Sequence, residues 1–175
     1  VSDNNAVANT VAEDATVGTA VGITATASDA DATNNEITYT LDDDADGLFT
    51  IHATTGVVTV NGALDYETAT SHDITARATS SDGSFSTLVF TINVTDVNEF
   101  AVSVISDSNG AVNAIAEDAA NGDTVGLTAL ASDADGTNNT ITYSLDDDAA
   151  GRFAIDSSTG SVTLADNSLI DFETS

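Results

Sequence analysis

Hydrophobic and polar residues alternate along most of this chain. Every second position is apolar in four runs: Ile23, Ala25, Ala27; Ile37, Tyr39, Leu41; Ile74, Ala76, Ala78; and Leu88, Phe90, Ile92, Val94. This period of two is typical of β-strands that bury one face. Turns rich in Asp, Asn, Gly and Ser separate the runs, and no amphipathic helix lies between them. The pattern predicts antiparallel sheets, with about seven strands packed as a β-sandwich.

The pattern occurs twice, with an offset of 104 residues. The segment SDADATNNEITYTLDDDADGLFTI at 28–51 returns as SDADGTNNTITYSLDDDAAGRFAI at 132–155. Self-similarity at such a long period indicates tandem domains, each able to form its own core. We predict an all-β protein of Greek-key sandwich repeats, with repeat 1 at 1–104, a linker at about 95–104, and repeat 2 at 105–175.

Repeat 2 is expected to be truncated, because the register places its last two strands after Ser175. A sandwich without these strands would expose a groove into its core and two unpaired sheet edges. The natural chain could continue, which we favour because Val1 also begins without the DVNE linker that precedes repeat 2. Alternatively, another molecule could supply the strands by β-strand addition.

The composition favours cations as partners. The 29 acidic residues stand against only Arg77 and Arg152, for a net charge of −27. Such a charge argues against binding to nucleic acid and against direct insertion into, or binding to, anionic membranes. Cysteine is absent, and no apolar run reaches the roughly 18 residues of a membrane span. The absence of cysteine fits either a cytosolic protein or a surface protein that uses metal ions for stiffness, and the excess of acids favours the second.

Several acids recur in the register of the repeat, which general acidity from a halophilic origin does not explain. The recurring acids are Glu13, Asp29, Asp31, Asp65 and Glu67, with the copies Glu117, Asp133, Asp135, Asp171 and Glu173. We expect the Glu13 turn, the Asp65 to Glu67 turn and the linker at one end of repeat 1, facing the Asp133 to Asp135 loop of repeat 2. Crowded carboxylates repel one another, whereas a hard cation takes six to eight oxygen ligands. Calcium is the expected ion.

The motifs in order resemble the cadherin repeat family, in particular the cadherin-like tandem repeats of very large bacterial surface proteins. The motifs are the A-E-D turn, the D-A-D loop followed by N-N-x-I-T-Y-x-L, F-x-I-x-x-x-T-G-x-V, L-D-Y-E or I-D-F-E, and D-V-N-E in the linker. The resemblance covers essentially the whole chain, and four of the five motifs occur twice. It implies a cadherin or immunoglobulin-like sandwich fold.

The resemblance also implies about three calcium ions at the junction of the repeats. The ligand set carried over from the family is Glu13, Asp65, Glu67, Val97, Asn98, Glu99, Phe100, Asp133, Asp135 and Asn139, with backbone donors near Phe100 and Asn139. Glu99 departs from the family pattern, which has Asp there. Weaker or incomplete sites are expected at Asp29, Asp31 and Asp82, with Ser80 as a rival to Asp82, and at Glu117, Asp171 and Glu173.

Other motifs are interpreted as structural. The run DDDADG at 42–47 imitates the start of an EF-hand, but its twelfth position is Ala53, where a bidentate Glu is needed. We expect a solvated acidic turn. His52 and His72 are expected to be surface residues. Gly56 and Gly160 are expected in hairpins that need a positive φ.

The favoured function is a calcium-rigidified extender module of a bacterial cell-surface or secreted adhesin or biofilm protein. The expected partners are calcium and neighbouring repeats, with homophilic or head-to-tail self-association as a further option. The alternative is an adhesive recognition module that binds another repeat or a polysaccharide, which would need an exposed aromatic platform or edge strand. The aromatics Tyr39, Phe49, Phe85, Phe90 and Phe153 are mostly expected to face the core. An enzyme is not expected, because no nucleophile and base stand beside the paired carboxylates.

Overall fold

The computed structural model describes residues 1–31 and 33–173. The chain divides into two compact units, Val1–Asn98 (unit 1) and Glu99–Ser175 (unit 2). The division lies inside the predicted linker. Among the described residues, no helix is long and apolar enough to cross a membrane.

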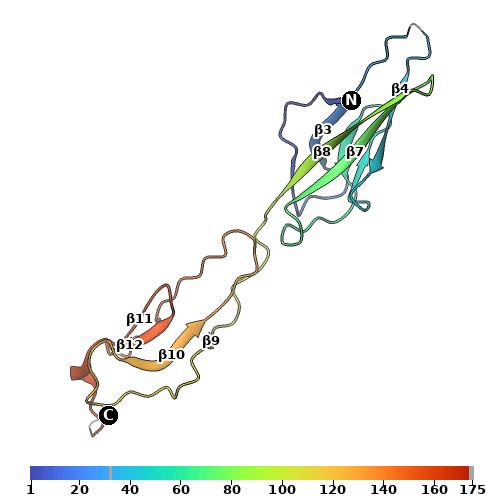
Figure 1. The fold of residues 1–175 in the computed structure, drawn as a ribbon. Helices are drawn as coiled ribbons and strands as arrows, with labels where there is room; N and C mark the ends of the chain where they lie inside the picture. The colour runs from blue at the N-terminus through green and yellow to red at the C-terminus, as the bar shows by residue number, and fades with distance from the viewer. Residues whose placement is uncertain (32, 174–175) are drawn as a thin grey trace. The chain divides into compact units, whose positions relative to one another are not determined.

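Unit 1 is an all-β sandwich of two four-stranded sheets, as the alternation predicted. The first sheet has the order β1-β3-β6-β5, and the second has the order β2-β8-β7-β4. In Figure 1 the paired strands β7 and β8 run side by side as the longest arrows of this unit. The strand bounds are β1 Ser2–Asp3, β2 Thr10–Ala12, β3 Ala20–Thr26, β4 Ile37–Asp43, β5 Phe49–Ile51, β6 Val57–Val60, β7 Ser71–Ser80 and β8 Phe85–Thr95.

The core of unit 1 lies between the two sheets and follows the predicted alternation. The first sheet contributes Val21, Ile23, Ala25, Phe49, Val58 and Val60, and the second contributes Val11, Tyr39, Ile74, Ala76, Ala78, Phe90, Ile92 and Val94. Leu88, which lies opposite Ala76 in the strand register, departs from the pattern. The exposed fraction of Leu88 is 39%.

One strand pair corrects the expectation of purely antiparallel sheets. β2 pairs with β8 in parallel, with Thr10 opposite Asn93 and Ala12 opposite Thr95. Parallel neighbours need a long crossover between them, and here the rest of unit 1 supplies it. Alternation along the chain cannot reveal this pairing, because it reports which face is buried and not the direction of the neighbouring strand.

Unit 2 repeats the first sheet of unit 1. Its strands have the order β11-β12-β10-β9 and bury Val125, Ala129, Val162 and Leu164. The bounds are β9 Ser106–Asp107, β10 Thr124–Leu130, β11 Phe153–Ile155 and β12 Ser161–Leu164, followed by the 3-10 turn η1 at Asn167–Leu169.

Residues 141–147 copy the sequence of β4, yet they form no strand in unit 2. β4 is held by antiparallel pairing with β7, and the described part of unit 2 contains no counterpart of β7. A strand needs a neighbour for its backbone groups. An apolar cavity of about 260 Å³ opens beside this segment, lined by Ile115, Val125, Leu127, Leu145, Phe153 and Val162.

The two predicted hairpin glycines have the backbone that their turns need. Gly56 and Gly160 both have φ of +70°. A Cβ atom at Gly56 would collide with the carbonyl oxygen of Ala25, and one at Gly160 would collide with that of Ala129. Close approach to the neighbouring strand therefore excludes side chains here, in addition to the positive φ.

Candidate functional site

The first acidic group, which we name the Glu13 cluster, consists of Glu13, Asp65 and Glu67 in unit 1. Each residue offers a carboxylate oxygen, and these oxygens lie within 4.8 Å of one another. Glu13 follows β2 directly, and its N–H donates to the carbonyl of Thr95 at 3.1 Å. The parallel pairing of β2 with β8 therefore fixes Glu13 beside the residues that follow β8.

Glu13 is buried, with 7% of its surface exposed. Its Oε2 accepts the backbone N–H of Tyr66 at 2.6 Å, and its Oε1 accepts that of Val97 at 2.7 Å. Hydrogen bonds from two N–H groups hold the carboxylate in one orientation. Each oxygen still has lone-pair capacity for a cation.

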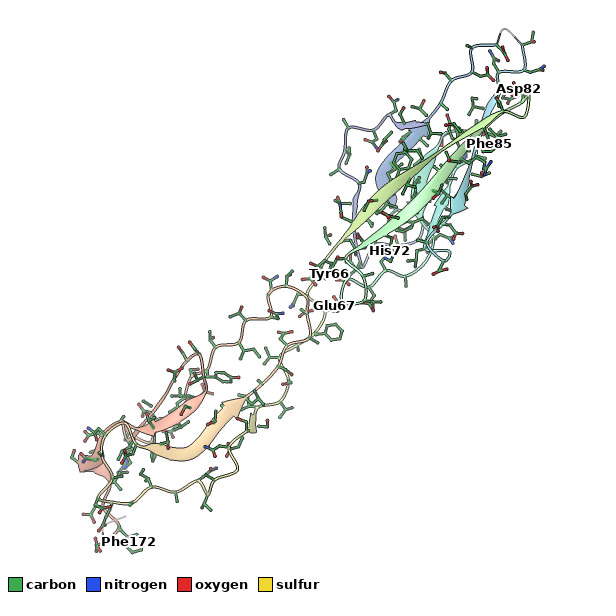
Figure 2. The ribbon with its side chains drawn as sticks, viewed as in Figure 1. Tyr66, Glu67, His72, Asp82, Phe85 and Phe172 are labelled. Carbon is green, nitrogen blue, oxygen red and sulfur yellow. The ribbon has the colours of Figure 1, made fainter. Side chains whose placement is uncertain are left out.

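Asp65 is also held by local hydrogen bonds. Its Oδ1 accepts the N–H of Thr68, and its Oδ2 accepts the hydroxyl of Thr68, both at 2.9 Å. Tyr66 points the other way and packs against the core. Figure 2 shows Tyr66 and Glu67 at the end of unit 1 opposite Asp82. The D-Y-E triplet thus places two acids on the outside of a turn that is anchored by the aromatic residue between them.

The second group, the Asp29 cluster, lies at the other end of unit 1 and consists of Asp29, Asp31 and Asp82. Their carboxylate oxygens also lie within 4.8 Å of one another. Oδ1 of Asp29 accepts the N–H of Asp31 at 3.0 Å. Oδ2 of Asp29 is closed off from solvent and has no hydrogen-bond partner among the described residues. A buried carboxylate oxygen in this state is suited to a cation.

Asp82 contributes a carboxylate to the Asp29 cluster, and its rival Ser80 lies in the same part of unit 1. The Ser80 hydroxyl donates to the carbonyl of Asn34 at 2.9 Å, and Ser80 is 5% exposed. The backbone N–H of Ser84 donates to Oδ1 of Asp82 at 2.8 Å and lowers the pKa of that carboxyl group. Asp82 therefore supplies the negative charge at this position, and Ser80 supplies a neutral hydroxyl.

In unit 2, Asp135 is the most deeply buried acid that the structure describes, with 2% of its surface exposed. Its Oδ1 accepts the backbone N–H groups of Glu99 at 3.0 Å and Phe100 at 3.1 Å. Burial alone would raise the pKa of Asp135, but hydrogen bonds from Phe100, Glu99 and Asp133 outweigh it, so the pKa is lowered.

The loop that carries Asp135 is closed by its own polar groups. The N–H of Asp135 donates to Oδ1 of Asp133 at 3.3 Å, and the Asn139 amide donates to the carbonyl of Asp135 at 2.9 Å. The sequence-predicted ligands Glu99, Phe100, Asp133, Asp135 and Asn139 are therefore gathered in one part of unit 2. Asp31, the copy of Asp135 in unit 1, is exposed.

A third group, the Glu117 cluster, repeats the Glu13 cluster in unit 2. Oxygens of Glu117, Asp171 and Glu173 lie within 4.8 Å of one another, and all three residues are exposed. Oε2 of Glu117 accepts the N–H of Phe172 at 3.2 Å. The cluster forms despite the two-residue insertion before Asp171. Glu117 is more exposed than Glu13 because the described part of unit 2 lacks a counterpart of β8.

A pair of recurring acids that sequence reasoning missed has a structural role. Oδ1 of Asp3 accepts the N–H groups of Asn5 at 2.9 Å and Thr24 at 3.0 Å. Its copy Asp107 accepts those of Asn109 at 2.9 Å and Thr128 at 3.1 Å. Both acids hold a short first strand onto its neighbour. Asp3 and Asp107 are 104 residues apart, so their recurrence could have identified them from the sequence. Their role shows that an acid can recur with the repeat because it stabilises the fold and not because it binds an ion.

The DDDADG run forms the solvated turn that was predicted. Oδ1 of Asp43 accepts the N–H of Ala45 at 3.0 Å, and Oδ1 of Asp44 accepts that of Gly47 at 2.8 Å. In unit 2, Oδ1 of Asp147 accepts the N–H of Ala149 and Oδ1 of Asp148 accepts that of Gly151, both at 2.8 Å. These carboxylates are used by the turn itself.

Two side chains lie where the sequence analysis did not expect them. Phe85 was expected to face the core but is 61% exposed, because its position in β8 lies on the outer face of the sheet. The Arg77 guanidinium lies 4.0 Å from its ring centroid and forms an ion pair with Asp42 at 2.6 Å. His72 was expected at the surface but is half-buried, 5.9 Å from the Phe49 ring. It shares the inward face of β7 with Ile74.

A family model, the cadherin domain, matches residues 8–95, which cover the sandwich of unit 1 from before β2 to the end of β8. The chain belongs to the cadherin domain family. Among curated relatives, this cadherin chain is 34% identical to mouse protocadherin Fat 4 over 152 residues, which is 83% of the chain and 3% of that protein. It is 41% identical to rat cadherin-22 over 93 residues, which is 51% of the chain and 11% of that protein.

The fold of this cadherin chain also agrees with solved structures. The crystal structure of mouse cadherin-23 EC22-24 superposes with a TM-score of 0.75 at 33% identity, covering 90% of this chain and half of that one. Cadherin domains are adhesion modules that bind Ca²⁺ at the junctions of their repeats. The oxygen-only donor sets described above, with the buried Oδ2 of Asp29, fit this ion. The chain spans a small fraction of the curated relatives that it matches.

Proposed function

We propose that this chain is a calcium-binding, calcium-rigidified extender segment of an extracellular or cell-surface adhesin. The observation that carries the proposal is the recurrence of one three-carboxylate geometry, in the Glu13 cluster and the Glu117 cluster. The bond from the N–H of the aromatic residue to the glutamate recurs as well. An insertion of two residues precedes the second copy, yet the three acids still converge. A bound cation would offset the repulsion among these carboxylates.

The proposed ligand set follows the family pattern and the local geometry within each unit. Glu13, Asp65 and Glu67 would bind calcium from unit 1, together with the linker residues Val97 and Asn98. From unit 2, Glu99, Phe100, Asp133, Asp135 and Asn139 would complete the coordination. About three ions would balance the six carboxylates of this set. The Asp29 and Glu117 clusters would serve neighbouring repeats, so calcium should bind them more weakly in residues 1–175 alone.

Calcium would stiffen the connection between consecutive repeats and keep a distal domain away from the cell. Extracellular modules bind calcium with dissociation constants of about 10⁻⁴ to 10⁻³ M, so only calcium-rich surroundings would rigidify the chain. Family membership supports a role in adhesion rather than catalysis. The bacterial setting is proposed from the sequence resemblance, and the relatives named above are animal proteins.

The test combines calorimetry with small-angle scattering. Titration of calcium into the chain should give a binding heat that fits about three ions per chain. Asp65→Asn should raise the dissociation constant for calcium at least tenfold. Asp46→Asn is the matched control, because it removes the same charge from the solvated turn. The radius of gyration should differ between calcium and chelator. Equal dimensions in the two conditions would contradict stiffening, and equal binding by Asp65→Asn would contradict the ligand assignment.

A specific observation favours recognition as a second candidate function. Phe85 and Val89 are 61% and 56% exposed, and they occupy alternate positions on the outer face of β8. The charged residue beside Phe85 is Arg77, which is paired with Asp42. The charges beside Phe85 therefore cancel in a strongly acidic chain, as a contact with another copy or a neutral polysaccharide would need.

Sedimentation at increasing concentration and a glycan pull-down test this second function. The double variant Phe85→Ser and Val89→Ser should lose any association of the native chain, whereas Val7→Ser, an exposed apolar residue elsewhere in unit 1, should keep it. If the native chain neither self-associates nor retains glycans, the recognition function is contradicted and the extender function is the one that stands.

A further inference from the structure

The turn after β5 and the turn after β11 have the same backbone hydrogen bonds but different capping side chains. In unit 1, the N–H of Gly56 donates to the carbonyl of His52 at 2.9 Å, and the N–H of His52 donates to the carbonyl of Val57 at 2.9 Å. In unit 2, Asp156 makes the equivalent bonds with Gly160 and Ser161, both at 2.9 Å. The two turns are therefore a natural pair for comparing a histidine with an aspartate.

Both side chains accept two backbone N–H groups from inside their turns. Nδ1 of His52 accepts Thr54 at 3.3 Å and Thr55 at 3.2 Å. Oδ1 of Asp156 accepts Ser158 at 3.0 Å and Thr159 at 2.8 Å. His52 thus has the role of an aspartate cap, and the sequence motif alone, which has His in one copy and Asp in the other, does not show this.

The two acceptors respond differently to protons. An imidazole accepts at Nδ1 only when it is neutral and carries its proton on Nε2, whereas a charged imidazolium has N–H groups at both nitrogens. Histidine changes its charge within the range of pH 5 to 8. The N–H groups of Thr159 and Ser158 lower the pKa of Asp156, so that carboxylate remains ionised and accepting in mild acid.

The strands around His52 carry few charged groups that could stabilise its protonated form, and Asp44, in the turn after β4, lines the same pocket as Ala53. Strand β5, which precedes His52, and the neighbouring strands β6 and β3 contain no ionisable side chain. At the far edge of the same sheet, β1 carries Asp3. In the facing sheet, β4 has Tyr39, Asp42 and Asp43, of which Asp42 is paired with Arg77. β7 contributes His72 beside Phe49, with Asp73 directed outward to Thr91.

We propose that His52 makes the turn after β5 a proton-sensitive element of unit 1, which opens in mild acid while the matching turn of unit 2 stays closed. Protonation of His52 at Nδ1 removes the acceptor for the N–H groups of Thr54 and Thr55. The new N–H group of the imidazolium then faces these two backbone N–H groups, so no hydrogen bond can form. Two backbone hydrogen bonds connect this turn to neighbouring strands. The N–H of Ala25 in β3 donates to the carbonyl of Gly56 at 2.8 Å, and the N–H of Tyr39 in β4 donates to the carbonyl of Ala53 at 2.9 Å. Opening therefore loosens the end of β3, the strand that leads to the Asp29 cluster.

Nuclear magnetic resonance of the full chain, in saturating calcium, tests each step. The ¹⁵N shifts of the His52 ring at pH 7.5 should show an unprotonated, hydrogen-bonded Nδ1 and a protonated Nε2. The protection of the Thr54 and Thr55 amides against hydrogen exchange should fall about tenfold between pH 7.5 and pH 5. Protection of Ser158 and Thr159 should stay constant.

Exchange of the two caps supplies the controls. His52→Asp should keep the Thr54 and Thr55 amides protected at both pH values, and Asp156→His should transfer the pH dependence to Ser158 and Thr159. His52→Ala should leave Thr54 and Thr55 weakly protected at both. A native chain with constant protection of Thr54 and Thr55 would overturn the proposal. So would a loss of protection in acid that persists in His52→Asp, since another group would then be responsible.

Discussion

The carboxylate of Glu13 accepts the backbone N–H of Tyr66 across 53 residues of sequence, at 2.6 Å. This bond connects the end of β2 to the D-Y-E turn and brings three acids together. Glu117 and Phe172 repeat the relationship at 3.2 Å in unit 2. The glutamate of the A-E-D motif therefore has two functions: it organises the acidic turn of its own repeat, and it supplies an oxygen to the group that we propose as a calcium ligand set.

Replacing Glu13 by Ala should destabilise unit 1 by about 2 to 4 kcal/mol even in chelator, because the N–H groups of Tyr66 and Val97 lose a charged acceptor. Glu117→Ala is the matched control in unit 2. It removes the same residue type from an exposed position and should change stability by less than about 1 kcal/mol. Urea unfolding with chelator measures both. Equal losses in the two variants would show that burial of Glu13 does not govern its contribution.

Gly56→Ala should destabilise unit 1 by about 3 kcal/mol or more, for two reasons. The added Cβ atom would collide with the carbonyl of Ala25, and the positive φ at this position is unfavourable for alanine. Gly83→Ala is the control, since Gly83 has φ of +94° but nothing within 4 Å of the added atom. That variant should lose only about 1 to 2 kcal/mol. Thermal unfolding of both variants checks the difference. Similar losses would mean that φ alone matters at Gly56.

Stability should fall in acid through Asp107 in unit 2. The N–H groups of Thr128 and Asn109 lower the pKa of this carboxyl group in the folded chain. A folded pKa below the unfolded value near 3.9 gives stability that is complete above the unfolded pKa and lost as pH falls through the folded one. Carboxyl ¹³C titration should place the Asp107 midpoint below 3.9. In Asp107→Asn, this part of the acid destabilisation should be absent, whereas its persistence would assign it to other carboxyl groups.

Removal of calcium should lower the urea midpoint of the chain, because the acidic clusters would then hold uncompensated charge. Raising the salt concentration to roughly 0.5 M in chelator should restore part of the loss, since exposed charges are screened over a shorter distance. The same salt should have little effect when calcium is saturating. A midpoint that does not respond to chelator would contradict calcium binding by the native state.

The sequence alone predicted the strands, the inward positions and the repeated acids. Alternation identified the core residues of β3 and β7, because a strand exposes opposite faces at successive positions. The D-Y-E triplet and the A-E-D turn both recur in the second repeat, so the sequence predicted that they act together. The positive φ of Gly56 could also be expected from the turn that it occupies.

Only the tertiary structure decided which distant groups meet. The parallel contact of β2 with β8, the capping of Tyr66 and Val97 by Glu13, and the capping of Thr54 and Thr55 by His52 all depend on three-dimensional hydrogen bonding. The outward position of Phe85 on β8 is different, because the alternation of Leu88, Phe90, Ile92 and Val94 already places residue 85 on the opposite face. Local sequence determines which face a residue can occupy, whereas burial and hydrogen-bond partners are set by the segments that fold against it.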